Sequence, residues 1–384
     1  MSVFINKYNC CGCSSCMNVC PKHAISMVED KEGFLYPYID EDKCIECNLC
    51  KNICLFSKKN KIKNGKKPIT YGVKHKNDEI RENSRSGGMF TAISDYILDK
   101  DGVVYGVGYK NHFEVCHKRA TSKQERNEFR GSKYVQSNLN DTFECIKNDL
   151  EDNRYVLFSG TPCQVDALHS YLSFCKINMD KLITCDLICH GTPSPLMWRE
   201  YIKFQEEKYK GIIQGFEFRN KRLYGWEEHV ETFNINGKEY SSRIFTKLFY
   251  DHIILRPSCY KCPYTSIYRD SDITLGDFWG VDKNINGFND NRGVSLILLN
   301  TGKGKKIFKS VKKQLNYELC RIEDCIQPAL HTNFEENNNR AQFWDDYYTY
   351  GFIYNLKKYL GYSKKFNFIE SLRFIIKKYR IKGE

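Results

Sequence analysis

The chain has 384 residues, enough for two or three domains, and its formal net charge is +12. Its 59 basic residues are interspersed with 47 acidic ones and no groove-reading motif is present, which argues against a nucleic-acid-binding protein. No stretch approaches the roughly 18 apolar residues of a membrane-spanning helix, and the first nine residues lack a signal-peptide pattern, so we expect a cytoplasmic protein whose 19 cysteines mainly serve metal binding.

The first predicted unit, residues 1–57, contains two cysteine runs that share one spacing. Each run reads CxxCxxCxxxC, and together they supply Cys10, Cys13, Cys16, Cys20, Cys44, Cys47, Cys50 and Cys54. In this spacing three thiolates can wrap one 4Fe-4S cluster while the fourth reaches the other cluster. The unit therefore resembles a bacterial two-cluster ferredoxin, in which Cys54 would join the cluster of the first run and Cys20 that of the second.

Zinc is the alternative occupant of these cysteines, but a tetrahedral zinc site favours two CxxC pairs separated by a loop. The second run also departs from the ferredoxin pattern, because Leu55 stands where proline usually follows the last cysteine. Cys11 lies outside the spacing and is expected to be a bystander. The lysine-rich run that follows predicts a solvated linker over residues 58–69.

Residues 70–335 are predicted to form the body of the protein, because strand-like and helix-like segments alternate there. Strands are expected at 71–75, 103–109, 155–159, 182–188, 273–275 and 294–299, and a helix at 89–100. The NGK sequence at 236–238 marks a hairpin. This alternation predicts an α/β (α+β) body built on a mixed sheet with flanking helices.

Three loops follow predicted strands, at the positions where open α/β sheets bind ligands. The first, at 84–88, opens a helix, so its amides and hydroxyls could hold a phosphate, although helix capping alone would also explain it. The second and third lie at 159–164 and 186–195. A thiol nucleophile at Cys163, assisted by His190, is one interpretation of these two loops.

Four loop cysteines indicate a different function, a third 4Fe-4S cluster in the body. They are Cys163, Cys189, Cys259 and Cys262, of which the last two form a CxxC pair shortly before the sequence DITLGDFWG. A zinc ion or a structural contact that involves only two of them is the alternative. The remaining thiols are expected to lie in the core: Cys116, Cys145, Cys175, Cys185, Cys320 and Cys325.

Residues 336–384 are predicted to form a helical, basic C-terminal tail. Its last part mixes apolar residues such as Phe366, Phe368 and Ile375 with cations such as Lys364 and Arg373. This pattern is typical of an amphipathic helix, which either docks on the body or rests on an anionic membrane or a partner protein.

Seven motifs in series resemble the coenzyme F420 hydrogenase/dehydrogenase beta subunit family. In chain order they are SRSGGMF, GSKYVQS, GTPCQV, DLICHGTPSP, CYKCPY, DITLGDFWG and GVSLILLNT, and they span most of residues 70–300. The resemblance includes a fused N-terminal ferredoxin and extends to the related plant hydroxymethyl chlorophyll reductases.

The resemblance implies an iron-sulfur flavoprotein oxidoreductase that binds FAD near the carboxyl ends of the strands, with the body cluster on the four loop cysteines. The flavin contacts that carry over are Ser86, Gly87, Gly88, Lys133, Tyr134 and Thr161. Lys133 would stabilise the reduced flavin anion, the alternative being a surface lysine in a turn. Hydride transfer at flavin N5 depends chiefly on positioning, so no residue is assigned as a catalytic acid or base.

The resemblance also implies electron exchange with a redox partner protein or a small-molecule donor or acceptor. The substrate would be an organic or deazaflavin-type molecule, and members of this fused kind often belong to surface-polysaccharide biosynthesis. A second hypothesis is an electron-transfer subunit without flavin that docks to a redox partner.

Overall fold

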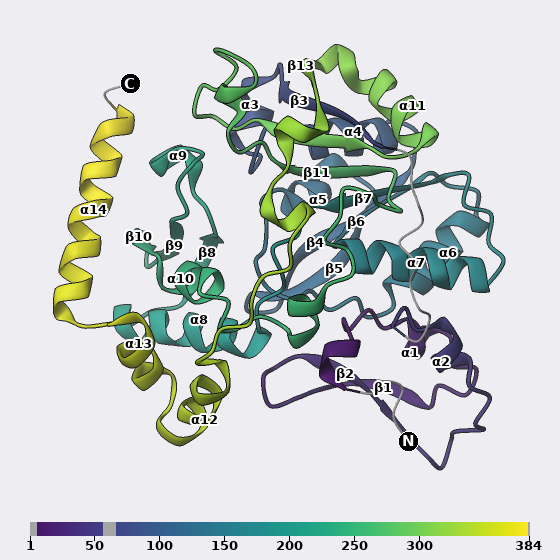
Figure 1. Cartoon of the computed structure of the whole chain (residues 1–384), viewed down its shortest axis with the longest axis horizontal. Helices are drawn as coiled ribbons and strands as arrows, with labels where there is room; N and C mark the ends of the chain where they lie inside the picture. Colours follow the sequence, from purple (N-terminus) through teal and green to yellow (C-terminus); the bar gives the residue numbers. More distant parts are fainter. Residues whose placement is uncertain (1–5, 57–66, 383–384) are drawn as a thin grey trace.

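The computed structural model describes residues 6–56 and 67–382. A small N-terminal unit lies beside a larger body, and a long C-terminal helix runs along the opposite flank of that body (Figure 1). Most of the predicted linker at 58–69 falls outside the described residues.

The N-terminal unit is built from two similar halves. Its elements are the 3-10 helix η1 (Lys7–Asn9), α1 (Ser15–Asn18), β1 (Ile25–Glu29), β2 (Leu35–Ile39) and α2 (Leu49–Ile53). β1 and β2 pair as an antiparallel ribbon. Ser14 and Asn48, which directly precede α1 and α2, both adopt left-handed backbone conformations with φ of 60° and 57°. The repeated cysteine spacing thus corresponds to a repeated turn and helix.

The body is organised around an eight-stranded mixed sheet. Its strands, in spatial order, are β13 (Leu315–Cys320), β3 (Ile69–His75), β12 (Ser295–Leu299), β11 (Ile273–Asp277), β7 (Leu182–Leu187), β6 (Val156–Gly160), β4 (Val103–Lys110) and β5 (Glu114–Ala120). β11, β7, β6 and β4 are mutually parallel, and the outer pairings are antiparallel. Their carboxyl ends therefore meet at one edge of the sheet.

Helices cover both faces of this sheet. Because side chains alternate along each strand, the strands contribute apolar side chains to both faces. α4 (Met89–Leu98) and α11 (Gly302–Val311) lie on one face, α6 (Thr142–Glu151) and α7 (Pro162–Phe174) on the other. In β6, Leu157 packs with the first pair while Val156 and Phe158 pack with the second. The fold class predicted from the sequence is confirmed.

A second, smaller sheet is added beside the main one. It consists of β10 (Lys238–Ser242), β9 (Glu231–Ile235) and β8 (Ile213–Glu217), packed with α8 (Pro195–Tyr209) and α10 (Ile244–Tyr250). The predicted hairpin joins β9 to β10, and Asn236 and Gly237 both have positive φ, as a type I′ turn requires.

Short helices complete the connections of the body. They are α3 (Asp78–Glu82), α5 (Lys123–Arg126), α9 (Lys221–Tyr224) and the 3-10 helices η2 (Asn127–Phe129), η3 (Pro257–Lys261), η4 (Val281–Lys283), η5 (Lys312–Gln314), η6 (Ile322–Cys325) and η7 (Pro328–Leu330).

The C-terminal region is helical, with α12 (Arg340–Tyr350), α13 (Phe352–Leu360) and α14 (Lys364–Lys382). One face of α14 docks on the body, where Glu370 is buried and bonds to Lys247 at 3.3 Å, and Phe374 contacts the ring of Tyr224. Figure 1 shows α14 at the edge of the molecule. In the part of the chain that the structure describes, no helix combines the length and apolar character needed to cross a membrane.

Candidate electron-transfer site

Two cysteine-lined cavities occupy the N-terminal unit. Cys10, Cys13, Cys16 and Cys54 line one of them, and Cys20, Cys44, Cys47 and Cys50 line the other. Each cavity thus takes three cysteines from one run and the fourth from the other run, which is the arrangement that two 4Fe-4S clusters require. The donor set fits two clusters, although ligation itself stays a prediction.

Several of these sulfurs already accept hydrogen bonds from the protein. The amide of Ala24 donates to Cys20 Sγ at 3.3 Å, and a guanidinium nitrogen of Arg256 lies 3.6 Å from Cys10 Sγ. Such bonds stabilise negative charge on a thiolate and tune the potential of a cluster. Contact with Cys11 lowers the pKa of Cys13 to about 6, whereas burial raises the pKa of Cys16.

The four body cysteines come from three separate parts of the body. Cys163 is in the first turn of α7, Cys189 follows β7, and Cys259 and Cys262 lie in and directly after η3. Burial raises the pKa of Cys189, and the thiols of the other three raise it further, so the four sulfurs are electrostatic neighbours. Their convergence fits the donor set of a third 4Fe-4S cluster.

Hydroxyl and amide groups surround the body cysteines as well. The hydroxyl of Thr161 lies 3.2 Å from Cys163 Sγ, and that of Thr192 lies 3.5 Å from Cys259 Sγ. The amide of Gly191 donates to Cys189 Sγ at 3.4 Å. Among residues 6–56 and 67–382, no group of three or more histidine, cysteine or carboxylate side chains is arranged to hold a single metal ion.

A cavity of about 790 Å³ opens at the carboxyl ends of the parallel strands, within the usual range for cofactor pockets. Its wall includes residues that follow β6, β7 and β11, and it contains Cys189 of the body cysteines. Five of the six predicted flavin contacts line it: Ser86, Gly88, Lys133, Tyr134 and Thr161. A ring bound in this cavity would therefore adjoin the body cysteines.

The loop before α4 differs from the sequence-based expectation of outward-facing polar groups. The Ser86 hydroxyl donates to the carbonyl of Val294 at 2.7 Å, and the Gly87 amide donates to the hydroxyl of Ser295 at 2.9 Å. Gly87 packs so closely on the sheet that an added Cβ would lie 2.1 Å from the carbonyl oxygen of Val73. Both groups therefore fix the loop to the sheet, and Gly87 lies behind the cavity wall.

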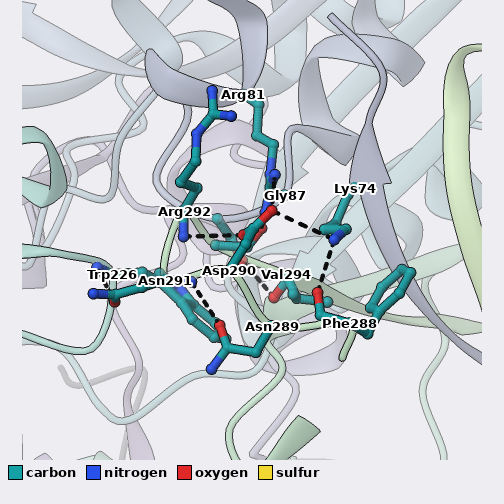
Figure 2. A network of polar contacts seen from close by, with 12 residues as sticks. Lys74, Arg81, Gly87, Trp226, Phe288, Asn289, Asp290, Asn291, Arg292 and Val294 are labelled. Atoms are coloured by element: carbon teal, nitrogen blue, oxygen red, sulfur yellow. Dashed lines mark hydrogen bonds and ion pairs between the residues drawn. The ribbon is translucent and has the colours of Figure 1, made fainter. Parts of the chain in front are cut away.

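A polar network holds residues 288–294, the segment that directly precedes β12 (Figure 2). The guanidinium of Arg81 forms an ion pair with Asp290 and donates to the carbonyl of Gly293 at 3.1 Å. Lys74 donates to the carbonyl of Phe288 at 2.8 Å. Burial alone would raise the pKa of Asp290, but Arg81 holds it at about 2. The network anchors the segment against which Ser86 and Gly87 pack.

Lys133 and Tyr134 lie on the cavity wall with their polar groups engaged by the protein. The ammonium of Lys133 donates to the carbonyls of Glu128 and Arg130, the latter at 3.1 Å, and burial lowers its pKa to about 7. The Tyr134 hydroxyl accepts from Arg219 at 3.3 Å. Lys133 thus changes charge near neutral pH within the cavity wall.

Arg219, Asp277 and Trp279 also line the cavity, and they were not identified as site residues from the sequence. Arg219 donates to Asp277 at 2.6 Å and stacks on the ring of Trp279, which in turn stacks on Trp226. Burial would raise the pKa of Asp277, but Arg219 and Arg85 lower it to about 2. Asp277 and Trp279 belong to the DITLGDFWG motif, which is the sequence feature that could have identified them as site residues.

The dyad of Cys163 with His190 is not formed. His190 Nε2 lies 2.9 Å from His252 Nε2, and its ring packs on Phe334. Burial lowers the pKa of His190 to about 4, and the neighbouring His252 makes a smaller contribution in the same direction. Cys163 instead contacts Thr161 and Cys11. A thiol nucleophile that depends on His190 is therefore not supported.

Comparison with protein families assigns three segments of the chain. Residues 9–57 match the 4Fe-4S dicluster domain, residues 70–144 the N-terminal part of the coenzyme F420 hydrogenase/dehydrogenase beta subunit, and residues 153–324 its C terminus. The two beta-subunit matches together cover well over half of the chain. The chain belongs to the coenzyme F420 hydrogenase/dehydrogenase beta subunit family and carries an N-terminal 4Fe-4S dicluster domain, as the motifs predicted.

Two relatives extend this assignment. Subunit beta of the F420-dependent formate dehydrogenase 1 of Methanococcus maripaludis is 25% identical over 252 residues, which are 63% of this chain and 59% of that protein. An uncharacterized ferredoxin of Methanocaldococcus jannaschii is 32% identical over 54 residues, which are 14% of this chain and 69% of that protein. The chain thus spans less than two thirds of the first relative.

Among solved structures, a chain of the F420-reducing nickel-iron hydrogenase complex of Methanosarcina barkeri is similar. Its TM-score is 0.47 and its identity 18%, with 66% of this chain and 82% of that chain covered. This likeness is too low to add to the fold described above. The family and the dicluster domain together define an iron-sulfur protein of an oxidoreductase family.

Proposed function

We propose that the protein is an iron-sulfur flavoprotein oxidoreductase with three 4Fe-4S clusters and one FAD. Two clusters would be held by the eight cysteines of residues 10–54, and the third by Cys163, Cys189, Cys259 and Cys262. FAD would occupy the cavity at the carboxyl ends of the parallel strands. When bound there, FAD supplies the exchange of a hydride with an organic molecule and of single electrons with a cluster.

The observation that carries this proposal is the continuity from the first cysteine run through the body cysteines to the cavity at the strand ends. Cys11 of the first run contacts both Cys13 and Cys163, so the N-terminal unit meets the body at its cysteines. Cys189, in turn, is one of the four body cysteines and also lines the cavity. Electrons could therefore pass between the dicluster unit and the cavity through side chains in contact.

The residues of this chain would bind and orient the ring and exclude water from it. Thr161 caps α7 and bridges the cavity to Cys163 Sγ, while Tyr134 is fixed by its bond to Arg219. Lys133 would supply positive charge beside the ring as long as it is protonated. Proximity and orientation, rather than a protein acid or base, would account for the rate.

The test is anaerobic purification followed by iron and flavin analysis. We expect about twelve iron atoms per chain, four for each cluster, and FAD in the supernatant after acid release. A protein that holds iron but no flavin would overturn the proposal in favour of an electron-transfer subunit without flavin.

The partner and the substrate follow from the same proposal. The formate dehydrogenase relative is a subunit, so we propose a redox partner protein that exchanges electrons through the dicluster unit. An organic or deazaflavin-type molecule would react in the cavity, and a role in surface-polysaccharide biosynthesis stays a prediction of the resemblance. Reduction of the bound flavin by the reduced form of coenzyme F420, followed by absorbance, tests the deazaflavin assignment, and no reduction would contradict it.

The outer face of α14 supports contact with an anionic membrane. Phe368, Leu372, Ile375 and Ile376 are exposed there, and Lys364 and Lys365 are exposed at the N-terminal end of the helix. Glu370 faces the body, and so do Lys377 and Lys378, which form ion pairs with Glu228 and Glu239. A basic amphipathic helix with an exposed apolar stripe is typical of attachment to an anionic bilayer. We expect sedimentation with phosphatidylglycerol vesicles but not with phosphatidylcholine vesicles. No sedimentation with either would contradict the proposal and leave a protein partner.

A further inference from the structure

Arg256 is a buried cation that links the body to the first cysteine run. It lies between the bridge residue Leu255 and helix η3, which carries Cys259, and only 1% of its surface is exposed. Its guanidinium reaches across to the N-terminal unit, where it donates to the carbonyl of Cys10 at 2.7 Å and to that of Leu35 at 3.0 Å.

Two aromatic rings and one amide complete its surroundings. The guanidinium lies 4.2 Å from the ring centre of Tyr36 and 5.4 Å from that of Phe34. It also donates to the amide oxygen of Gln136 at 2.8 Å, and Gln136 in turn donates to the carbonyl of Cys11 at 3.2 Å. Arg256 and Gln136 therefore clamp the loop of the first cysteine run onto the body.

Gly12 lies where the clamp meets the loop, in a left-handed backbone conformation that favours glycine. Gly12 has a φ of +69°, and a Cβ added there would lie 2.5 Å from Gln136 Nε2 and 2.9 Å from a terminal nitrogen of Arg256. The thiol of Cys11, which directly precedes Gly12, contacts Cys13 on one side and Cys163 on the other. This loop is therefore the junction between the dicluster unit and the body.

The charge of Arg256 has no carboxylate partner among residues 6–56 and 67–382, since no ion pair joins it to an aspartate or glutamate there. A buried cation destabilises the folded protein unless opposite charge compensates it. Burial lowers the pKa of Arg256, but the nearby thiols of Cys10, Cys11 and Cys259 and the phenol of Tyr36 raise it. An oxidised 4Fe-4S cluster with four thiolates carries about two negative charges and would supply the compensation.

We infer that Arg256 is a positioning residue of this junction: it fixes the Cys10–Gly12 loop on the body and serves as the counter-charge of the cluster that Cys10 holds, so that it raises the reduction potential of this cluster. The inference rests on the proposed function for the presence of the clusters. Reduction adds one electron to the cluster, and a fixed cation with an N–H group 3.6 Å from Cys10 Sγ stabilises the reduced form more than the oxidised form.

The test is redox titration of the full-length, anaerobically purified protein, followed by electron paramagnetic resonance. We expect Arg256→Gln to keep its iron and to lower the potential of one ferredoxin cluster by at least 59 mV, which is a tenfold change in a one-electron equilibrium. Arg256→Lys keeps the charge and should leave this potential closer to that of the unchanged protein.

Arg199 offers a matched control, because it pairs with Glu29 of the N-terminal unit across the same interface but is exposed. Arg199→Gln should leave all potentials unchanged. An unchanged potential in Arg256→Gln, or equal shifts in the Gln and Lys variants, would overturn the inference. If Arg256→Gln loses iron, the Lys variant decides alone: a loss of iron there too, or a shift of 59 mV or more, would overturn it. A preparation without flavin contradicts the proposed function but leaves this titration valid.

Discussion

The N-terminal unit and the body are stabilised in different ways. In the body, β12 is buried along its whole length, and large apolar clusters lie on both faces of an eight-stranded sheet. The N-terminal unit has a two-stranded ribbon whose own cluster contains Ile25 and Ile39 together with cysteines. A unit this small rarely has enough apolar core to fold alone. Bound clusters would therefore provide much of the folding free energy of the N-terminal unit.

Removal of iron would produce the largest difference between the two regions. After treatment with a chelator under reducing conditions, we expect trypsin to cleave within residues 6–56, where Lys22, Lys31 and Lys43 provide sites, while residues 67–382 resist. Mass spectrometry of the fragments measures this. Equal resistance of both regions without iron would contradict the comparison, and reconstitution with iron and sulfide serves as the control.

Loss of one body cysteine is expected to have the next largest effect. Cys259→Ser should lower the iron content by about four atoms per chain while the body stays folded on its apolar core. Cys145→Ser on α6 is the matched control and should retain all the iron. An unchanged iron content in Cys259→Ser would return Cys259 and Cys262 to a structural role.

A smaller effect on the body is expected when the ion pair of Figure 2 is broken. Asp290→Asn leaves the buried guanidinium of Arg81 without its counter-charge, and we expect a loss of about 1–3 kcal/mol in the free energy of unfolding. Urea denaturation at pH 7 measures it, with Asp99→Asn of an exposed pair as the control.

The pH dependence of this pair has a defined sign. The pKa of Asp290 is about 2 in the folded protein and near 4 when the chain is unfolded, so the contribution is complete above pH 4 and is lost as the pH falls through about 2. Stability that falls between pH 4 and 2 to the same extent in Asp290→Asn would contradict this account.

The smallest expected effect concerns the charge of Lys133 in the cavity. Because burial places the pKa of Lys133 at about 7, its positive charge is lost as the pH rises from 6 to 8. We expect FAD affinity to fall over this range, by on the order of 1 kcal/mol, and Lys133→Met to remove the dependence. Quenching of flavin fluorescence measures the affinity. The same dependence in Lys133→Met would exclude this lysine as its source.

Local features of the fold could be predicted from the sequence. The continuous apolar run at 294–299 forms the fully buried strand β12, and the NGK sequence at 236–238 forms the hairpin of β9 and β10. Three of the four cysteines in each ferredoxin cavity follow from spacing for the same reason, since they lie within a few residues of one another in a single run. Periodicity and spacing record such short-range geometry directly.

Contacts between distant parts of the chain could not be predicted in this way. Arg256 meets Cys10 across 246 positions, and no local pattern around either residue marks the contact. Cys11 was expected to be a bystander because it breaks the spacing, yet it touches Cys163 of the body. The hydroxyl of Ser86 was expected to face a ligand, but the sheet already provides its acceptor. Such partners are set by tertiary packing.

The exchange of one cysteine between the two cavities has a consequence for synthesis of the protein. Cys20 is made early but lines the cavity of the second run, and Cys54, the last of the eight, completes the cavity of the first. A nascent chain that stops between Cys50 and Cys54 therefore presents all four sulfurs of the second cavity but lacks the fourth sulfur of the first. We expect the second cavity to be the first able to receive a cluster during synthesis, whereas the cavity that begins with Cys10 must wait until Cys54 has left the exit tunnel.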